Sequence, residues 1–156
     1  MQNKKYKVSS LEQTNQVAID IVSHLQPGAI VLLHGNLGAG KTTLIQHMGK
    51  YLGVKAHMSS PTFNLLNQYR GRLQNTIVEV FHLDLYRVRS NDSIIDLNFF
   101  ELSRFERFIA FVEWPEKANT DWGHFGANLY NLHINPLFND HEIDLEKIER
   151  EITFEF

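Results

Sequence analysis

One stretch of the sequence, AIVLLHGNLGAGKTTLIQHMGKY (residues 29–51), constrains the fold more than any other. It begins with five apolar residues in a row, a pattern typical of a strand that is buried on both faces. Three glycines follow within six residues, and glycine costs conformational entropy unless the backbone needs its freedom. The residues after them predict a helix over 42–51, with Gly53 as its stop signal. A strand, a glycine-rich loop and a helix in this order favour an α/β fold.

The glycine-rich loop has the spacing of a phosphate-binding loop. Gly35, Gly40, Lys41 and Thr42 match G-x-x-x-x-G-K-[ST] in full. Glycines let successive backbone N–H groups point at an anion, and the helix N-terminus adds its positive end. The lysine meets the β- and γ-phosphates, and the threonine hydroxyl binds Mg²⁺. Because a chance glycine-rich turn rarely meets all four positions between a strand and a helix, the loop predicts a site for a nucleoside triphosphate, without distinguishing ATP from GTP.

The remaining pattern completes a single domain over residues 1–156. Ser9 and Glu12 have the spacing of a capping box at the start of a helix that continues to Leu25. A weakly helical stretch covers 92–105. Strands are expected at 63–69 and 76–84, joined in a hairpin by an Arg70-Gly71-Arg72 turn, and at 108–114, 128–134 and 151–156. This order predicts a P-loop NTPase-like three-layer sandwich with a mixed central sheet.

Two carboxylates are candidates for the metal that accompanies a triphosphate. Asp84 ends one strand pattern, and Glu113 follows the apolar run FIAFV. Ligands collect at the carboxyl ends of strands in α/β folds, so one carboxylate would bind the metal and the other would orient a water molecule. The residues alone do not rank the two. Thr62 lies where P-loop proteins can carry a threonine that senses the γ-phosphate, although an ordinary Ser-Pro turn fits the same place.

Composition limits the function classes. A formal net charge of −3 argues against a protein that binds nucleic acid through bulk positive charge. The absence of cysteine excludes disulfides, zinc–thiolate sites and a catalytic thiol. The sequence has no secretory signal pattern and no apolar run near the length of about 18 residues that spans a membrane. We therefore expect a soluble cytoplasmic protein without membrane contact.

Four segments in order carry a more specific resemblance: GNLGAGKTT, SPTFNLL, HLDLYR and VEWPEK. Together they resemble the TsaE family, the small bacterial ATPases of the tRNA threonylcarbamoyladenosine pathway, over residues 9–134. The resemblance implies a P-loop ATPase that binds ATP and Mg²⁺ and hydrolyses ATP slowly alone. It implies two protein partners, the TsaD and TsaB subunits, which put a threonylcarbamoyl group on the tRNA adenosine next to the anticodon. Contact with tRNA would then be indirect.

The resemblance also implies roles for single residues. Thr42 and Glu113 would be the metal positions, and Asp84 would be the second acidic group. Thr62 would face the γ-phosphate, and with Lys41 and the two carboxylates it would form the catalytic set. The phosphates would be held by Gly38, Ala39, Gly40, Lys41, Thr42 and Thr43.

Further positions complete the expected nucleotide site. Trp114 would lie beside the nucleotide, and Leu11 with Glu12 would touch the adenine. The sequence departs from the family pattern at Asn36, where the family usually has aspartate, and in the stretch that follows Arg87. The late basic residue of the family is replaced near His141.

The residues by themselves leave two other functions open. A small-molecule or nucleoside kinase could use the same loop, but it would need an acceptor pocket and usually a lid with arginines. The arginines of this chain are scattered, and the chain is short for a lid. A nucleotide-binding regulator without meaningful catalysis is the third possibility.

Overall fold

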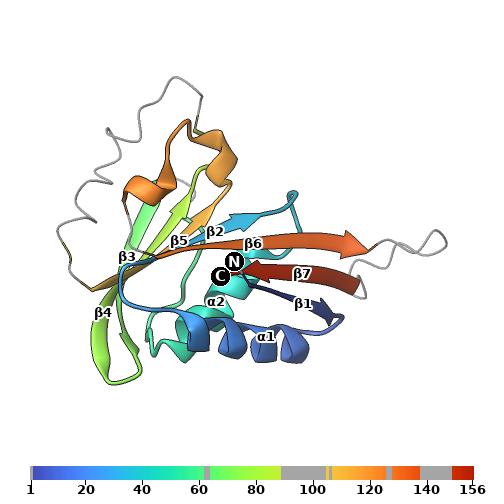
Figure 1. The fold of residues 1–156 in the computed structure, drawn as a ribbon, viewed down its shortest axis with the longest axis horizontal. Coiled ribbons are helices and arrows are strands. Elements are labelled where there is room, and N and C mark those ends of the chain that lie inside the picture. The colour runs from blue at the N-terminus through green and yellow to red at the C-terminus, as the bar shows by residue number, and fades with distance from the viewer. Residues whose placement is uncertain (1, 62–63, 89–104, 106, 126–127, 138–148) are drawn as a thin grey trace.

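A mixed sheet of seven strands organises the chain, in the order β1-β7-β6-β2-β5-β4-β3 (Figure 1). The computed structural model describes residues 2–61, 64–88, 105, 107–125, 128–137 and 149–156. Pairing is parallel for β2 with β5, β2 with β6 and β4 with β5, and antiparallel for the other neighbours. The predicted mixed sheet is therefore confirmed. Its strands are β1 (Asn3–Val8), β2 (Ala29–His34), β3 (Leu66–Leu73), β4 (Thr76–Asp84), β5 (Phe108–Glu113), β6 (Asn128–Leu137) and β7 (Glu149–Glu155).

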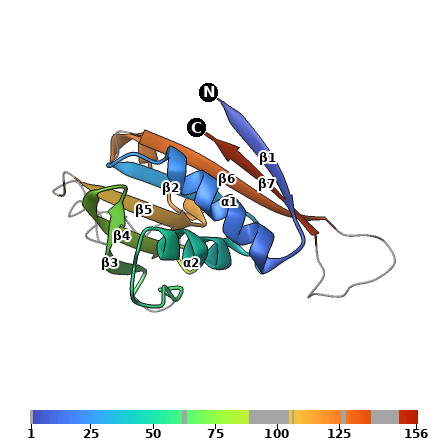
Figure 2. The same cartoon turned by 90° about the horizontal axis from the view of Figure 1, so that it is seen from below.

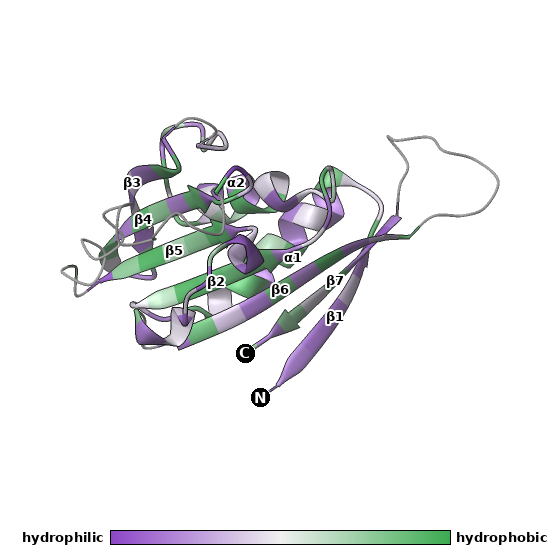
Figure 3. Cartoon of the chain, turned by 90° about the horizontal axis from the view of Figure 1, so that it is seen from above, coloured by the Kyte–Doolittle hydropathy of each residue, from purple (hydrophilic) through white to green (hydrophobic). Residues whose placement is uncertain are grey.

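Two helices, α1 (Leu11–His24) and α2 (Lys41–Tyr51), cover one face of the sheet (Figure 2). Their buried side chains join one apolar cluster with Val31, Leu33 and Phe111 from the central strands. On the opposite face, Ile30 and Val112 belong to a second cluster. That cluster also includes residues of the segment that carries the short helices η3 (Pro115–Lys117) and η4 (Trp122–His124). Burial on both faces explains the unbroken apolar runs of β2 and β5, which Figure 3 shows as hydrophobic.

The start of α1 differs in detail from the capping box expected at Ser9 and Glu12. Ser10 is the N-cap, and its Oγ accepts a hydrogen bond from the backbone N–H of Gln13 at 3.2 Å. The Gln13 side chain accepts in return from the backbone N–H of Ser9 at 2.7 Å. The cap therefore lies one residue later than predicted, because Gln13 replaces Glu12 as its reciprocal partner.

The end of α2 agrees with the predicted stop at Gly53. Gly53 has a φ of +69°, which favours glycine. Its N–H donates to the carbonyl of Lys50, and the N–H of Val54 donates to the carbonyl of Gly49. This is the Schellman arrangement, which satisfies the last carbonyls of the helix.

The hairpin of β3 and β4 is present, but its turn is not at Arg70-Gly71-Arg72. The strands pair from Leu66 with Leu83 to Leu73 with Thr76, so the connection consists of residues 74 and 75. Gly71 lies inside β3, where a Cβ would meet the carbonyl oxygen of Leu52 at 2.9 Å. Gly71 therefore serves a close backbone contact rather than a turn.

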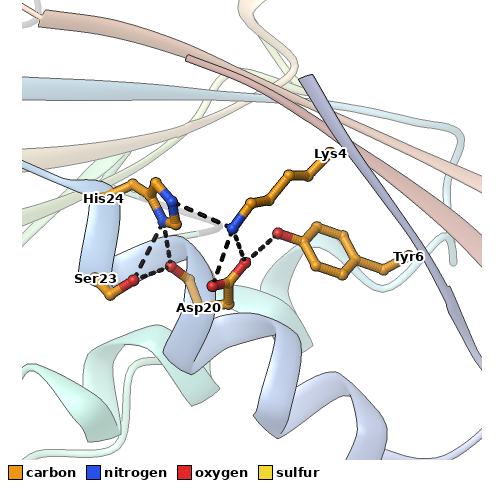
Figure 4. Close-up of polar contacts among 5 residues, drawn as sticks. All are labelled: Lys4, Tyr6, Asp20, Ser23 and His24. Carbon is orange, nitrogen blue, oxygen red and sulfur yellow. Dashed lines mark hydrogen bonds and ion pairs between the residues drawn. The ribbon is translucent and has the colours of Figure 1, made fainter. Parts of the chain in front are cut away.

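Strand β1 was not predicted from the sequence, which suggested only a basic start. It pairs with β7 at one edge of the sheet, and side chains fasten it to α1 (Figure 4). Lys4 Nζ lies 3.0 Å from Asp20 Oδ2, and the Tyr6 hydroxyl donates to the same carboxylate. The C-terminal strand thus gains a neighbour from the other end of the chain.

Two further expectations from the sequence concern a weak helix and the lack of a membrane-spanning segment. The weakly helical stretch at 92–105 lies outside the described residues, apart from Phe105. Within the described part of the chain, neither helix is long and apolar enough to cross a bilayer.

Candidate functional site

The glycine-rich loop connects β2 to α2, as the sequence predicted. The φ angles are +151° at Gly35, +77° at Gly38 and +104° at Gly40. At Gly35 a Cβ would also lie only 2.6 Å from the carbonyl oxygen of Ile134. Gly40 is the N-cap of α2 and offers no side chain to the helix amides. The positive end of α2 is therefore available to an anion from outside the loop.

Lys41, the first residue of α2, has its ammonium bonded to carbonyls of this loop. Its Nζ donates to Gly35 at 2.6 Å and to Asn36 at 3.0 Å, and the residue is 4% exposed. Burial lowers the pKa of Lys41, while the negative charge of Glu113, followed by that of Asp84, opposes this shift. A buried cation and two carboxylates therefore share this end of the sheet.

Trp114 provides a second contact for the lysine. Its backbone is left-handed, with a φ of +58°, which is uncommon for a residue other than glycine. Lys41 Nζ lies 3.9 Å from the centre of the indole ring, within cation–π range. The centres of the Tyr86 and Trp114 rings lie 5.1 Å apart. The left-handed turn follows β5 and leaves Trp114 beside the loop lysine.

Glu113, the last residue of β5, links the loop helix to the sheet. Its Oε1 accepts hydrogen bonds from Thr42 Oγ1 at 2.8 Å and from His82 Nε2 at 2.9 Å. Glu113 is 3% exposed and His82 is fully buried. Among the described residues, the hydrogen bonds to this carboxylate all go to Oε1. The structure thus brings together Thr42 and Glu113, the two residues expected at the metal.

Asp84 lies next to Glu113, since the two residues are register partners across β4 and β5. Its Oδ2 accepts from Ser60 Oγ at 2.5 Å, and its Oδ1 accepts from the backbone N–H of Tyr86 at 3.0 Å. Each candidate carboxylate ends a strand, as predicted, and the structure adds that the two strands are adjacent and parallel. The hydrogen bond from Thr42, however, goes to Glu113 and not to Asp84. The structure thus distinguishes two candidate metal ligands that the residue pattern alone did not rank.

Two cavities adjoin the loop and share Gly40 and Thr43 in their walls. One, here called the loop cavity, has a volume of about 380 Å³, and the other, the α1 cavity, about 410 Å³. The loop cavity is otherwise lined by Leu37, Gly38, Lys41, Thr42, Ser60, Asp84, Tyr86, Arg87, Glu113 and Trp114. The α1 cavity is otherwise lined by Val8, Ser9, Ser10, Leu11, Thr14, Ala39, Leu44, Ile134, Arg150 and Ile152.

Most of the residues that we expected from the sequence to bind a nucleotide form the walls of one of these two cavities. Leu11, the first residue of α1, is 67% exposed and belongs to the α1 cavity together with Ala39. The catalytic candidates Lys41, Asp84 and Glu113 all belong to the loop cavity. Two positions named from the sequence, Thr62 and His141, lie outside the described residues.

Arg150 is a residue of this region that the sequence analysis missed. It lies on β7, and its Nε donates to the carbonyl of Ala39 at 3.0 Å. The contact joins residues 111 positions apart, so only the pairing of β7 with β6 brings it to the loop. The sequence predicted a strand from 151, and β7 starts two residues earlier. The sequence analysis took the late basic residue of the family pattern to be replaced near His141, so no signal in the sequence pointed to Arg150.

Comparison with known proteins decides the family. The family model described as threonylcarbamoyl adenosine biosynthesis protein TsaE matches residues 8–148. The chain belongs to the TsaE family. Two similar proteins, each described as tRNA threonylcarbamoyladenosine biosynthesis protein TsaE, come from Synechocystis and Nostoc. The first is 35% identical over 116 residues, covering 72% of this chain and 71% of the relative. The second is 37% identical over 120 residues, covering 74% and 70%.

A solved structure agrees on the fold of this TsaE-family chain. The crystal structure of Bacillus subtilis YdiB superposes with a TM-score of 0.62 and covers 98% of this chain and 84% of its own. The two sequences are 24% identical, so the likeness concerns the fold. The family model and the two relatives confirm the resemblance seen in four short segments at the level of the family.

Proposed function

We propose that this chain is a Mg²⁺-dependent ATPase that supports threonylcarbamoylation of the tRNA adenosine next to the anticodon. It would work in the cytoplasm on a partner transferase of the TsaD and TsaB type, and contact tRNA only indirectly. Membership in a family described by threonylcarbamoyl adenosine biosynthesis supports the pathway. The observation that carries the ATPase assignment is the hydrogen bond from Thr42 to Glu113, next to a complete G-x-x-x-x-G-K-T loop. It joins a hydroxyl and a carboxylate, the two kinds of group that hold Mg²⁺ in P-loop proteins.

The proposal includes a P-loop NTPase-like three-layer sandwich. The loop follows β2, and the candidate ligands lie at the carboxyl ends of β4 and β5, which run parallel to β2. That edge is where ligands bind in open α/β sheets. The helices supply one layer, and the apolar cluster on the opposite face supplies the surface that a third layer would cover.

The loop fits a triphosphate on steric and electrostatic grounds. At Gly38 the space around a would-be Cβ is open to 4 Å, so an anion can approach the backbone closely. Gly40 leaves the N-terminus of α2 uncapped by a side chain. Lys41 would exchange its bonds to two loop carbonyls for phosphate oxygens, which carry more negative charge.

The oxygen ligands near the loop fit a magnesium ion. Thr42 donates a hydrogen bond to Glu113, so the lone pairs of its hydroxyl remain for a cation. Mg²⁺ prefers oxygen ligands and keeps several waters, and when bound it would neutralise charge on the phosphates. Asp84, held by Ser60 and by a backbone N–H, would orient a water molecule. Thr62 is proposed to face the γ-phosphate.

The α1 cavity suits the base of the nucleotide. Its walls combine apolar side chains such as Leu11 and Ile134 with polar ones, including Ser10 and Arg150. Apolar surface for a ring together with polar groups that fix its orientation is typical of small-molecule sites. Because this cavity shares Gly40 and Thr43 with the loop cavity, one nucleotide could occupy both.

The test is nucleotide binding by Lys41→Ala, with Lys50→Ala as the matched control on the same helix. Lys50 is exposed in the last turn of α2. Titration with a fluorescent ATP analogue and Mg²⁺ should show a loss of affinity of about ten- to a hundredfold for Lys41→Ala, since a charged hydrogen bond is worth about 1.5–3 kcal/mol. The control should bind like the unaltered chain. Equal binding by all three proteins would contradict the proposed role of the loop.

Phosphate release then distinguishes the proposed ATPase from a kinase. Release should rise when purified TsaD and TsaB type partners are added, and Glu113→Gln should keep binding but lose that stimulated release. Transfer of phosphate to an added nucleoside or metabolite would instead favour the kinase. Complementation of the tRNA modification by Lys41→Ala would show that nucleotide binding at this loop is not what the pathway needs.

A further inference from the structure

His82 is a histidine in the interior of the molecule whose place is not explained by packing alone. It lies on β4 between Phe81 and Leu83 and is fully buried. Its Nδ1 is the one buried side-chain nitrogen or oxygen among the described residues that has no hydrogen-bond partner. An unpartnered polar atom is costly in the interior, and an apolar residue would fill the same space without that cost. The position therefore holds a histidine for what its other nitrogen does.

That other nitrogen contacts the carboxylate of Glu113. Nε2 lies 2.9 Å from Oε1, and a carboxylate accepts hydrogen bonds. Nε2 must therefore carry the proton and donate it. Nδ1 then presents a lone pair rather than an N–H without an acceptor, so the tautomer is decided by Glu113.

The carboxylate of Glu113 is held from two directions. Thr42 donates to Oε1 from α2, and His82 donates to the same oxygen from β4. The described contacts leave the lone pairs of Oε2 available, and Glu113 lines the loop cavity. In the proposed site Thr42 serves two partners, because its hydroxyl donates to Glu113 while its lone pairs face the cation. Among the described residues, His82 has Glu113 as its one hydrogen-bond partner, so it can keep Oε1 in place.

We propose that His82 is a positioning residue that orients Glu113 for metal binding, an assignment that rests on the proposed function. Groups that hydrogen-bond to a metal ligand fix its orientation, and their loss typically lowers metal affinity by about ten- to a hundredfold. The role is specific to the metal. Nucleotide binding without metal depends on the loop and Lys41, which His82 does not contact in the described structure.

The test compares His82→Leu with His82→Gln. Glutamine places an amide N–H donor near the position of Nε2, whereas leucine fills the space without a donor. Mn²⁺ binding to the nucleotide complex, followed by electron paramagnetic resonance, should weaken about ten- to a hundredfold in His82→Leu. His82→Gln should recover most of the affinity. Nucleotide affinity measured in EDTA should stay the same in both variants, and the exposed His57→Leu is the control.

The outcomes separate this proposal from the proposed function. If the unaltered chain binds nucleotide without any dependence on Mg²⁺ or Mn²⁺, the proposed function fails and the role of His82 with it. If metal dependence is present but His82→Leu keeps it, or if His82→Gln loses as much as His82→Leu, only the positioning role is wrong. If a variant does not fold, the proposal can still be tested on the unaltered chain. Long-range ¹⁵N spectra should show His82 protonated at Nε2, and protonation at Nδ1 alone would overturn the proposal.

Discussion

At the scale of single residues, Gly35 is the loop glycine with the least room for a side chain. Both its φ of +151° and the carbonyl oxygen of Ile134, 2.6 Å from a would-be Cβ, oppose any substitution. Gly35→Ala should lower the free energy of unfolding by about 3 kcal/mol, from backbone strain and overpacking together. Gly38→Ala should cost only about 1 kcal/mol, because its strain is left-handed backbone alone and its surroundings are open. Urea denaturation of the two variants checks the difference, and equal losses would show that the Ile134 contact yields.

The residues of the candidate site differ in how far the sequence could predict them. The loop is local, so its spacing indicates its chemistry directly. Thr42 and Glu113 are 71 residues apart, and only the parallel pairing of β4 with β5 shows that Asp84 and Glu113 are neighbours. The sequence therefore supplied both carboxylates but could not decide which of them Thr42 contacts. His82 and Arg150 also contact residues far away in the sequence, at separations of 31 and 111 residues, and neither has a local pattern that reveals its partner.

At the scale of elements, the start of α1 depends on Ser10 rather than on Ser9. Ser10→Ala removes the side chain that caps the N–H of Gln13, so it should lower the free energy of unfolding by about 1 kcal/mol. Ser9→Ala should cost less, because the backbone N–H of Ser9 keeps its bond to the Gln13 side chain. Thermal and urea unfolding of both variants measure the pair. A larger loss in Ser9→Ala would favour the cap that the sequence suggested.

Elements were predicted well where an apolar pattern reflects burial. They were predicted less well where a glycine can serve either a turn or a close backbone contact. The apolar runs of β2 and β5 arise because both faces of the central strands are covered, and Gly53 ends α2 as expected. Gly71 was misread as a turn residue. Its absence of a side chain serves the carbonyl of Leu52 instead, and that contact comes from a segment far from the hairpin turn.

At the scale of the whole molecule, one edge of the sheet brings the two ends of the chain together in neighbouring strands. The backbone N–H of Gln2 donates to the carbonyl of Phe156 at 2.7 Å, and the N–H of Phe156 donates back to Gln2 at 2.9 Å. Strand β1, drawn as largely hydrophilic in Figure 3, was missed because its lysines resemble a solvated tail. It becomes a strand only because β7 offers an edge and α1 offers Asp20. The mixed character of the sheet could be predicted, but its order could not.

The fastening of β1 to α1 should make the stability of the molecule depend on pH in the acid range. The pKa of Asp20 is lowered first by the hydrogen bond from Tyr6, and Lys4 adds to the effect (Figure 4). The unfolded chain then takes up the Asp20 proton at a higher pH than the folded chain. The stabilisation is therefore complete above the ordinary aspartate pKa of about 4 and is lost as the pH falls through the lowered value. Because Asp20 is partly exposed, solvent screening makes this a modest contribution.

Tyr6→Phe isolates that contribution, since it removes the leading cause of the shift and keeps the aromatic ring. Nuclear magnetic resonance titration of Asp20 should show its pKa moving up towards the ordinary value in this variant. Urea unfolding at several pH values should then show a smaller fall in stability from pH 7 to pH 3 than in the unaltered chain, because folding no longer favours the Asp20 carboxylate as strongly. Asp20→Asn should flatten the same fall further and lower the stability at pH 7. An Asp20 pKa that does not respond to Tyr6→Phe would mean that Lys4, not the tyrosine hydroxyl, holds the carboxylate ionised and fastens β1 to the rest of the molecule.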